Sequence, residues 1–249
     1  MRPSTAVIIP VFNEEQSLPL VLGDIPAEHV DTVFVVDNGS TDRSAEVARA
    51  GGAVVVTEPR KGYGSACLAG IAAARGFDVI AFLDGDYSDH PDELPRLLEP
   101  VVAGRADFVV GSRMQQRESR RALLPQSRFG NWLASVLMRL LFGIRCSDLG
   151  PFRVIRRDAL DRLGMQDRDF GWTVEMQLRA KLANLRVLEV PVSYRERVGV
   201  SKITGTLSGT LRASYKILKT IFAYRLKPPR LAPATDSEPR AGHETPSAE

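Results

Sequence analysis

The fold is decided by a stretch in the first half of the chain, Val79-Ile80-Ala81-Phe82-Leu83-Asp84-Gly85-Asp86. Its first five residues are continuously apolar, which is typical of a strand buried on both faces of a parallel sheet. Its last three residues form a polar turn that carries two carboxylates. Similar apolar runs predict four further strands, at residues 5–10, 32–36, 53–57 and 108–110.

Helical patterns separate these strands, at residues 42–50, 63–75 and 92–102. Strands that alternate with helices form a mostly parallel, Rossmann-like sheet flanked by helices, so the sequence predicts the α/β class. Ligands of such sheets bind beyond the carboxyl ends of the strands. The residues directly after each strand are therefore the candidates for a functional site.

The second half of the chain is less regular. It predicts helices at 131–142 and 172–183, a strand at 186–190, and a C-terminal amphipathic helix at 203–226. Helical spacing places the apolar side chains of the last helix on one face (Leu207, Leu211, Leu218, Phe222) and its cations on another (Arg212, Lys216, Lys219). Residues 227–249 hold five of the 16 prolines and few large apolar groups, which predicts a disordered tail.

Composition limits the classes of protein that fit. The 249 residues include two cysteines, too few for a disulfide scaffold and typical of a reducing compartment such as the cytoplasm. The longest stretch without a charge is 13 residues, whereas a membrane-spanning helix needs about 20 apolar residues. The three histidines have no zinc-binding spacing.

The positive charge is concentrated. Lys and Arg number 33 against 30 Asp and Glu, but residues 197–235 contain eight cations and no acid, and residues 108–147 contain seven arginines and one acid. Both stretches adjoin apolar helical segments, a composition that suits peripheral binding to the anionic inner face of a membrane. A solvated basic face is the alternative. No motif supports binding of nucleic acid.

Polar turns follow three of the predicted strands, at residues 10–15, 37–42 and 84–86. Each of the first two alone fits an ordinary loop. Asp84 and Asp86 flank a single glycine, and two carboxylates so close repel each other unless a cation lies between them. A hard divalent ion that also binds diphosphate oxygens would relieve this repulsion.

Taken together, the motifs resemble those of family 2 GT-A glycosyltransferases, and among them the dolichyl-phosphate and polyprenyl-phosphate mannose or glucose synthases. Seven collinear segments between residue 5 and about residue 225 carry the resemblance: Ile8 to Glu15, Val36 to Asp42, Lys61 to Ala66, Leu83 to Pro91, Val110 to Arg113, Ser147 to Arg153, and Arg197 to Lys202.

The resemblance implies a role for each motif. Asp84 and Asp86 would hold Mg²⁺ or Mn²⁺. The nucleotide sugar would contact Pro10, Phe12, Glu14, Val36, Asp37, Asn38, Arg60, Lys61, Asp84, Gly85 and Asp86. The phosphates and the acceptor would contact Arg113, Arg153, Arg197, Ser201 and Lys202. Position 38 is commonly aspartate in the family, so Asn38 would present an amide to the base.

The function that follows is an inverting, metal-dependent hexosyltransferase. A metal and nearby cations would stabilise the charge that develops on a nucleoside diphosphate as it leaves. UDP-glucose and GDP-mannose both fit the motif residues. A polyprenyl phosphate acceptor is ionised at neutral pH and needs no strong base, whereas a hydroxyl acceptor needs one, with Asp148 as the candidate. Asp148 could equally pair with Arg153 or cap a turn.

Three further hypotheses concern the remaining motifs and the domains. Gly62-Tyr63-Gly64 is not a dinucleotide fingerprint, because Cys67 occupies the place of the third glycine. Phe170 and Trp172 fit either an acceptor contact or the core. One domain is expected over 1–226, with a nucleotide-sugar half to about 115 and an acceptor half beyond it. A non-catalytic nucleotide-sugar-binding protein is the third functional alternative, which the presence of both aspartates disfavours.

Overall fold

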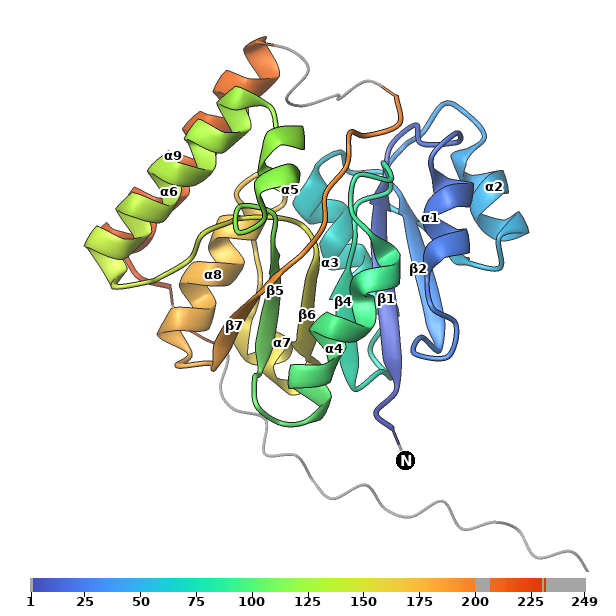
Figure 1. Ribbon diagram of the computed structural model, residues 1–249, viewed down its shortest axis with the longest axis horizontal. Coiled ribbons are helices and arrows are strands. Elements are labelled where there is room, and N and C mark those ends of the chain that lie inside the picture. The colour runs from blue at the N-terminus through green and yellow to red at the C-terminus, as the bar shows by residue number, and fades with distance from the viewer. Residues whose placement is uncertain (1, 200–206, 230, 232–249) are drawn as a thin grey trace, which may run out of the picture.

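The computed structural model describes residues 2–199, 207–229 and 231. Its centre is a seven-stranded sheet in the order β3-β2-β1-β4-β6-β5-β7 (Figure 1). The strands are β1 (Thr5–Val11), β2 (Thr32–Asp37), β3 (Val54–Thr57), β4 (Val79–Phe82), β5 (Phe108–Ser112), β6 (Arg153–Arg156) and β7 (Val187–Pro191). Only β6 runs antiparallel to its neighbours, β4 and β5. The predicted mostly parallel sheet is confirmed.

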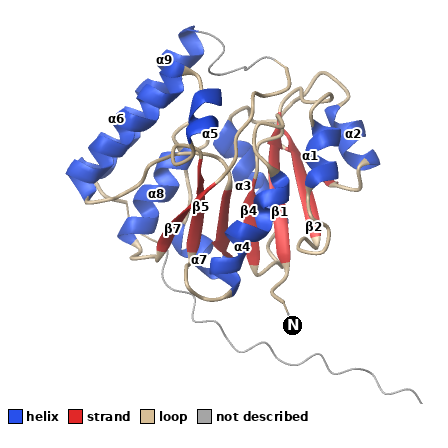
Figure 2. Ribbon diagram, in the orientation of Figure 1, coloured by secondary structure: helices blue, strands red, loops and turns tan. Residues whose placement is uncertain are grey.

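Helices cover both faces of the sheet (Figure 2). One face packs against α1 (Leu18–Asp24), α2 (Ser44–Ala50) and α4 (Leu94–Val102), which follows the short 3₁₀ helix η1 (Pro91–Glu93). The other face packs against α3 (Tyr63–Ala73), α7 (Arg157–Leu163) and α8 (Trp172–Leu182). Alternation along β1 supplies both cores, since Val7 and Ile9 face the first layer and Ile8 faces the second.

Three more helices complete the fold: α5 (Arg117–Ala122), α6 (Pro125–Phe142) and α9 (Leu207–Leu226). The helices α6 and α9 lie side by side at the left of Figure 1 and form a third apolar cluster with α8. Helix α6 begins at Pro125, six residues before the predicted start, because proline is favoured in the first helical turn. The elements α1, α5, β6 and α7 were not predicted.

The packed face of α9 differs from the prediction. Ile221 is fully buried and Ile217 and Tyr224 pack beside it, whereas Phe222 is 48% exposed. Lys216, predicted on a polar face, forms an ion pair of 3.0 Å with Asp167, which lies in the segment before α8. Two apolar stripes overlap on this helix, and the stripe at 217, 221 and 224 meets the protein. The side chains of Leu207, Leu211 and Arg212 lie outside the described residues.

No helix among the described residues has the length and apolar character needed to cross a bilayer. The predicted disordered tail falls almost entirely outside the described residues. The two predicted halves share one sheet, because β6 from the second half pairs with β4 from the first.

Candidate active site

Three polar turns converge at the carboxyl edge of the sheet. They follow β1, β2 and β4, and they meet because β1 lies between the other two strands. They surround a cavity of about 300 Å³, which is lined by Pro10, Val11, Phe12, Glu14, Asn38, Lys61, Gly62, Tyr63, Ala66, Asp84, Gly85, Asp86, Phe170 and Arg197. The cavity therefore lies where the topology predicts a ligand site.

Most of the residues expected at the nucleotide sugar lie in this lining, and three do not. Val36 is fully buried in the sheet core, Arg60 is exposed outside the cavity, and the Asp37 carboxylate accepts a hydrogen bond from the Ser40 backbone at 2.9 Å. The lining residues that sequence reasoning gave no role are Val11, Gly62, Tyr63 and Ala66. All four lie within motifs that carry the family resemblance, Val11 in the segment Ile8 to Glu15 and the others in the segment Lys61 to Ala66, so a signal for them was present.

Crowded carboxylates give the site its electrostatic character. Burial, and then the charges of Asp86 and Asp89, raise the pKa of Asp84 well above its usual range. Burial raises the pKa of Asp89 to about 7. Asp86 is 8% exposed, and its Oδ1 accepts hydrogen bonds from the backbone and hydroxyl of Ser88. A bound cation would relieve this crowding.

The donor set fits a hard divalent ion that shares its coordination with a ligand. Asp84 and Asp86 supply carboxylate oxygens beside a cavity that is open to a ligand. No group of three or more His, Cys, Asp or Glu side chains within the described ranges could hold a metal by itself. Mg²⁺ commonly binds through one or two carboxylates together with phosphate oxygens and water.

The side chain of Asn38 is engaged within the protein. Its Nδ2 donates to the carbonyl oxygens of Glu58 and Arg60, each at 2.8 Å, and its Oδ1 accepts from the Gly62 backbone at 2.8 Å. The expectation that the amide serves the base is therefore wrong for its N–H groups, because both are already used. Asn38 instead fastens the loop at residues 58–62 to the end of β2. An aspartate here could not donate either bond.

A close backbone approach explains the glycines of Gly62-Tyr63-Gly64. A Cβ at Gly64 would lie 2.1 Å from the Asp167 carbonyl oxygen, and one at Gly62 would lie 2.2 Å from that of Arg168. The Ser65 backbone donates to the same Arg168 oxygen at 3.0 Å. This contact brings the segment before α8 to the cavity.

The two aromatic residues of that segment have different positions. Phe170 lines the cavity, whereas Trp172 is fully buried and packs against Phe82, with ring centroids 4.9 Å apart. Trp172 therefore belongs to the core, whereas a contact between Phe170 and an acceptor stays a prediction.

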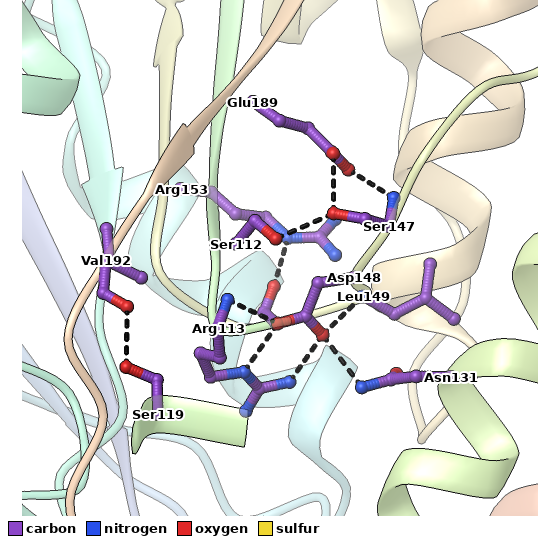
Figure 3. Close-up of polar contacts among 11 residues, drawn as sticks. Ser112, Arg113, Ser119, Asn131, Ser147, Asp148, Leu149, Arg153, Glu189 and Val192 are labelled. Atoms are coloured by element: carbon purple, nitrogen blue, oxygen red, sulfur yellow. Dashed lines mark hydrogen bonds and ion pairs between the residues drawn. The ribbon is translucent and has the colours of Figure 1, made fainter. Parts of the chain in front are cut away.

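Arg113 and Asp148 form a buried ion pair beside the cavity (Figure 3). The two Asp148 oxygens accept from Nε and Nη2 of Arg113, each at 2.8 Å, and also from the Asn131 amide and the backbone of Leu149. Burial raises the pKa of Asp148, but the charge and hydrogen bonds of Arg113 outweigh it and leave the pKa below its usual value. Asp148 is therefore a poor general base, and the expectation of that role is not supported.

The remaining phosphate-binding candidates are dispersed. Arg153 is fully buried; its Nε donates to the Gly150 carbonyl at 2.7 Å, and its Nη1 donates to the Thr173 carbonyl at 2.8 Å. Arg153 forms no ion pair with Asp148 and does not line the cavity. The prediction of a phosphate contact is therefore wrong for Arg153. Arg197 does line the cavity. Ser201 and Lys202 lie outside the described residues.

A family model described as "Glycosyl transferase family 2" matches residues 6–164, which contain all three turns of the cavity. The chain belongs to glycosyl transferase family 2. This confirms the predicted transferase class and the family resemblance. The sheet and its helices agree with the GT-A type of fold expected for that family.

Relatives in the family span most of the chain. It is 41% identical over 219 residues to an uncharacterized glycosyltransferase of Mycobacterium tuberculosis, covering 88% of this chain and 98% of the relative. It is 35% identical to an undecaprenyl-phosphate mannosyltransferase of Micrococcus luteus, covering 81% of this chain and 88% of the relative. It is 31% identical to a polyprenol monophosphomannose synthase of Mycolicibacterium smegmatis, covering 87% of each.

Solved structures agree with the fold. The chain resembles glucosyl-3-phosphoglycerate synthase from Mycobacterium tuberculosis, solved with Mn²⁺, UDP and phosphoglyceric acid, with a TM-score of 0.74, 24% identity, and coverage of 91% of this chain and 80% of that one. At this identity the likeness establishes the architecture.

Proposed function

We propose that this chain transfers a hexose, with inversion, from a nucleoside diphosphate sugar to a polyprenyl phosphate. The observation that carries the proposal is the cavity that brings Asp84 and Asp86 together with Arg197 at the carboxyl edge of the sheet. Two relatives that are at least 31% identical are named for polyprenyl-phosphate mannosyl transfer. Their names favour mannose, while UDP-glucose remains the other donor to test.

In this proposal the donor fills the cavity, with its base and ribose near Phe12, Glu14 and Lys61. Asp84 and Asp86 hold Mg²⁺ or Mn²⁺, which supplies electrostatic stabilisation of the departing diphosphate. Lys61 Nζ lies 5.3 Å from the centre of the Phe12 ring, so the pair presents a cation and an apolar surface at the rim. Arg197 and Arg113 provide further positive charge for the phosphates.

The state of Asp148 favours a phosphate acceptor over a hydroxyl acceptor. A hydroxyl must lose a proton as it attacks and needs a base. The base candidate from the sequence is fully buried and committed to Arg113. A phosphate monoester has a second pKa near 6 and is already ionised at neutral pH. The ion pair then serves to position Arg113.

A bilayer contact would bring such an acceptor to the site. The outer face of α6 and α9 exposes six large apolar side chains: Phe129, Trp132, Leu140, Tyr215, Phe222 and Leu226. Exposed cations accompany them: Arg128, Arg139, Lys219 and Arg225. Apolar and basic groups together suit an anionic lipid surface. The proposal places the enzyme peripherally on such a surface.

Transfer is tested with radiolabelled sugar nucleotides. The purified chain is incubated with polyprenyl phosphate, Mn²⁺ and one donor at a time, and products are separated into lipid and aqueous phases. We expect label in the lipid phase with a single donor, and none with Asp86→Asn. Label that appears only on an added glycan, in the aqueous phase, would overturn the polyprenyl acceptor.

Membrane binding is tested by flotation with vesicles. A Trp132→Ser/Phe222→Ser variant should lose binding to vesicles rich in phosphatidylglycerol. The matched control is Leu20→Ser/Val102→Ser, which removes two apolar side chains, 44% and 50% exposed, on other helices. Equal loss in both variants, or no binding by the wild type at low salt, would contradict the membrane contact.

A further inference from the structure

Arg197 bridges two carboxylates that belong to different turns of the cavity. Its Nη2 lies 2.9 Å from Glu14 Oε1, after β1, and its Nη1 lies 3.1 Å from Asp86 Oδ2, after β4. The three side chains are 11% to 25% exposed, so the contacts are largely withdrawn from solvent. One guanidinium therefore neutralises charge on both sides of the cavity.

The backbone delivers Arg197 to this position. The segment at residues 194–198 lies alongside the turn after β4. The Val198 backbone donates a hydrogen bond to the Asp86 carbonyl oxygen, and the Arg195 backbone donates one to the Ser88 carbonyl oxygen, each at 3.0 Å. The Arg195 guanidinium lies 3.6 Å from the centre of the Tyr87 ring. Because backbone hydrogen bonds hold the segment on both sides of Arg197, its guanidinium stays at the cavity, within reach of a ligand bound there.

The bond from Arg197 uses the oxygen that a metal would need. Asp86 Oδ1 already accepts the backbone and hydroxyl of Ser88, so Oδ2 is the atom open to a cation. A divalent ion at Oδ2 would share this oxygen with the guanidinium, and two cations so close to each other repel. A metal that arrives alone therefore competes with Arg197 for Asp86, and displacement would leave the partly buried guanidinium with Glu14 but without Asp86, which is costly.

We propose that Arg197 is an internal cation that holds Asp86 until metal and nucleoside diphosphate bind together. Asp84 and Asp86 would then hold the metal, and the diphosphate would give the displaced guanidinium a new anionic partner. The inference rests on the metal site of the proposed function. It makes metal and nucleotide binding mutually reinforcing, since coupling between two ligands is reciprocal. Arg197 is thereby a positioning residue in the empty site and a phosphate ligand in the loaded one.

Direct binding of Mn²⁺ to the full chain tests this exchange without measuring turnover. Free Mn²⁺ is quantified by electron paramagnetic resonance, with and without UDP or GDP. Without nucleotide, Arg197→Gln should bind Mn²⁺ about tenfold more tightly than wild type, within the usual range of coupling between sites. Nucleotide should strengthen Mn²⁺ binding by wild type more than by the variant. Arg197→Lys should fall between the two.

Two controls separate the possible failures. Arg195→Gln removes a neighbouring cation of the same segment that does not touch Asp86 Oδ2, and its Mn²⁺ affinity should stay near wild type. Asp86→Asn should lose Mn²⁺ binding. If Asp86→Asn binds as well as wild type, the proposed metal site itself is wrong. If Asp86→Asn fails to bind but Arg197→Gln matches wild type or binds more weakly, only the exchange is overturned.

Discussion

Arg113 and Asp148 meet through two hydrogen bonds of 2.8 Å in a setting where the carboxylate is fully buried. The Asn131 amide from α6 adds a third bond, also of 2.8 Å, to the same carboxylate. The position of Arg113 is thus tied through Asp148 to a helix whose outer face carries Trp132. In the proposed function, the contact with the bilayer and the binding of phosphate would both depend on the buried cluster of Arg113, Asp148 and Asn131.

Removal of the Asp148 charge should destabilise the protein strongly. Asp148→Asn leaves Arg113 buried without its counterion, and we expect a loss of about 3–5 kcal/mol in the free energy of unfolding. Urea denaturation at pH 7 measures it. Asp161→Asn is the control, because the Asp161 side chain is 43% exposed and its pair with Arg157 should contribute less than about 1 kcal/mol. Similar losses in both variants would contradict the importance of the buried pair.

Asn38→Asp tests the fastening of the loop at residues 58–62. The variant cannot donate to the carbonyls of Glu58 and Arg60, so we expect a loss of about 1–3 kcal/mol in stability. Donor binding, measured by calorimetry, should weaken as well because Lys61 is carried by that loop. Asn184→Asp, at an exposed position away from the cavity, should leave donor binding unchanged and cost less than about 1 kcal/mol, because it places a carboxylate at the C-terminal end of α8. If Asn38→Asp binds donor as wild type does, the loop does not depend on this amide.

Gly64→Ala should disrupt the approach of the segment before α8. The new Cβ would meet the Asp167 carbonyl oxygen at 2.1 Å, and relief of that overlap should cost about 1–3 kcal/mol. Gly23→Ala, in α1 with open space around its Cβ position, should instead raise stability by up to about 1 kcal/mol. Thermal unfolding of both variants distinguishes a packing effect from a general intolerance of alanine.

The buried Asp89 predicts a pH dependence. Burial raises the pKa of Asp89 to about 7, against the pull of the nearby Arg113 charge. The folded state therefore keeps a proton that the unfolded chain loses near pH 4, and stability falls as pH rises from about 4 to about 7, by at most about 1.4 kcal/mol per pH unit. Asp89→Asn should remove the part of this fall that comes from Asp89 and leave the part that comes from the raised pKa of Asp84, so its advantage over wild type should grow toward pH 8.

The measurement is a series of urea denaturations from pH 4.5 to pH 8 with EDTA present, which removes any contribution from bound metal. Asp92→Asn, whose side chain is 62% exposed, is the control and should follow the wild-type profile. A constant difference between Asp89→Asn and wild type across this range would show that Asp89 does not titrate there.

The sequence predicted the elements whose signal is local. The strands ending at Val11 and Asp37 read as buried runs, and the motif positions placed Asp84 and Asp86 at one sheet edge. The prediction for the buried face of α9 was wrong because two apolar stripes compete there, and packing against α6 and α8 selects the one with Ile221. The role of Asn38 depends on a carbonyl 20 residues away and that of Asp148 on an arginine 35 residues away, and no motif specifies either partner.

The single antiparallel strand has a consequence for how the chain folds during synthesis. Until Arg153–Arg156 emerges from the ribosome, β4 has an unpaired edge and β5 lacks both of its neighbours, β6 and β7. A nascent chain of about 115 residues contains every carboxylate of the cavity, yet its sheet ends at an open edge that invites aggregation. The half of the chain that carries these carboxylates is thus not an autonomous module, and separate expression of it should yield an insoluble product.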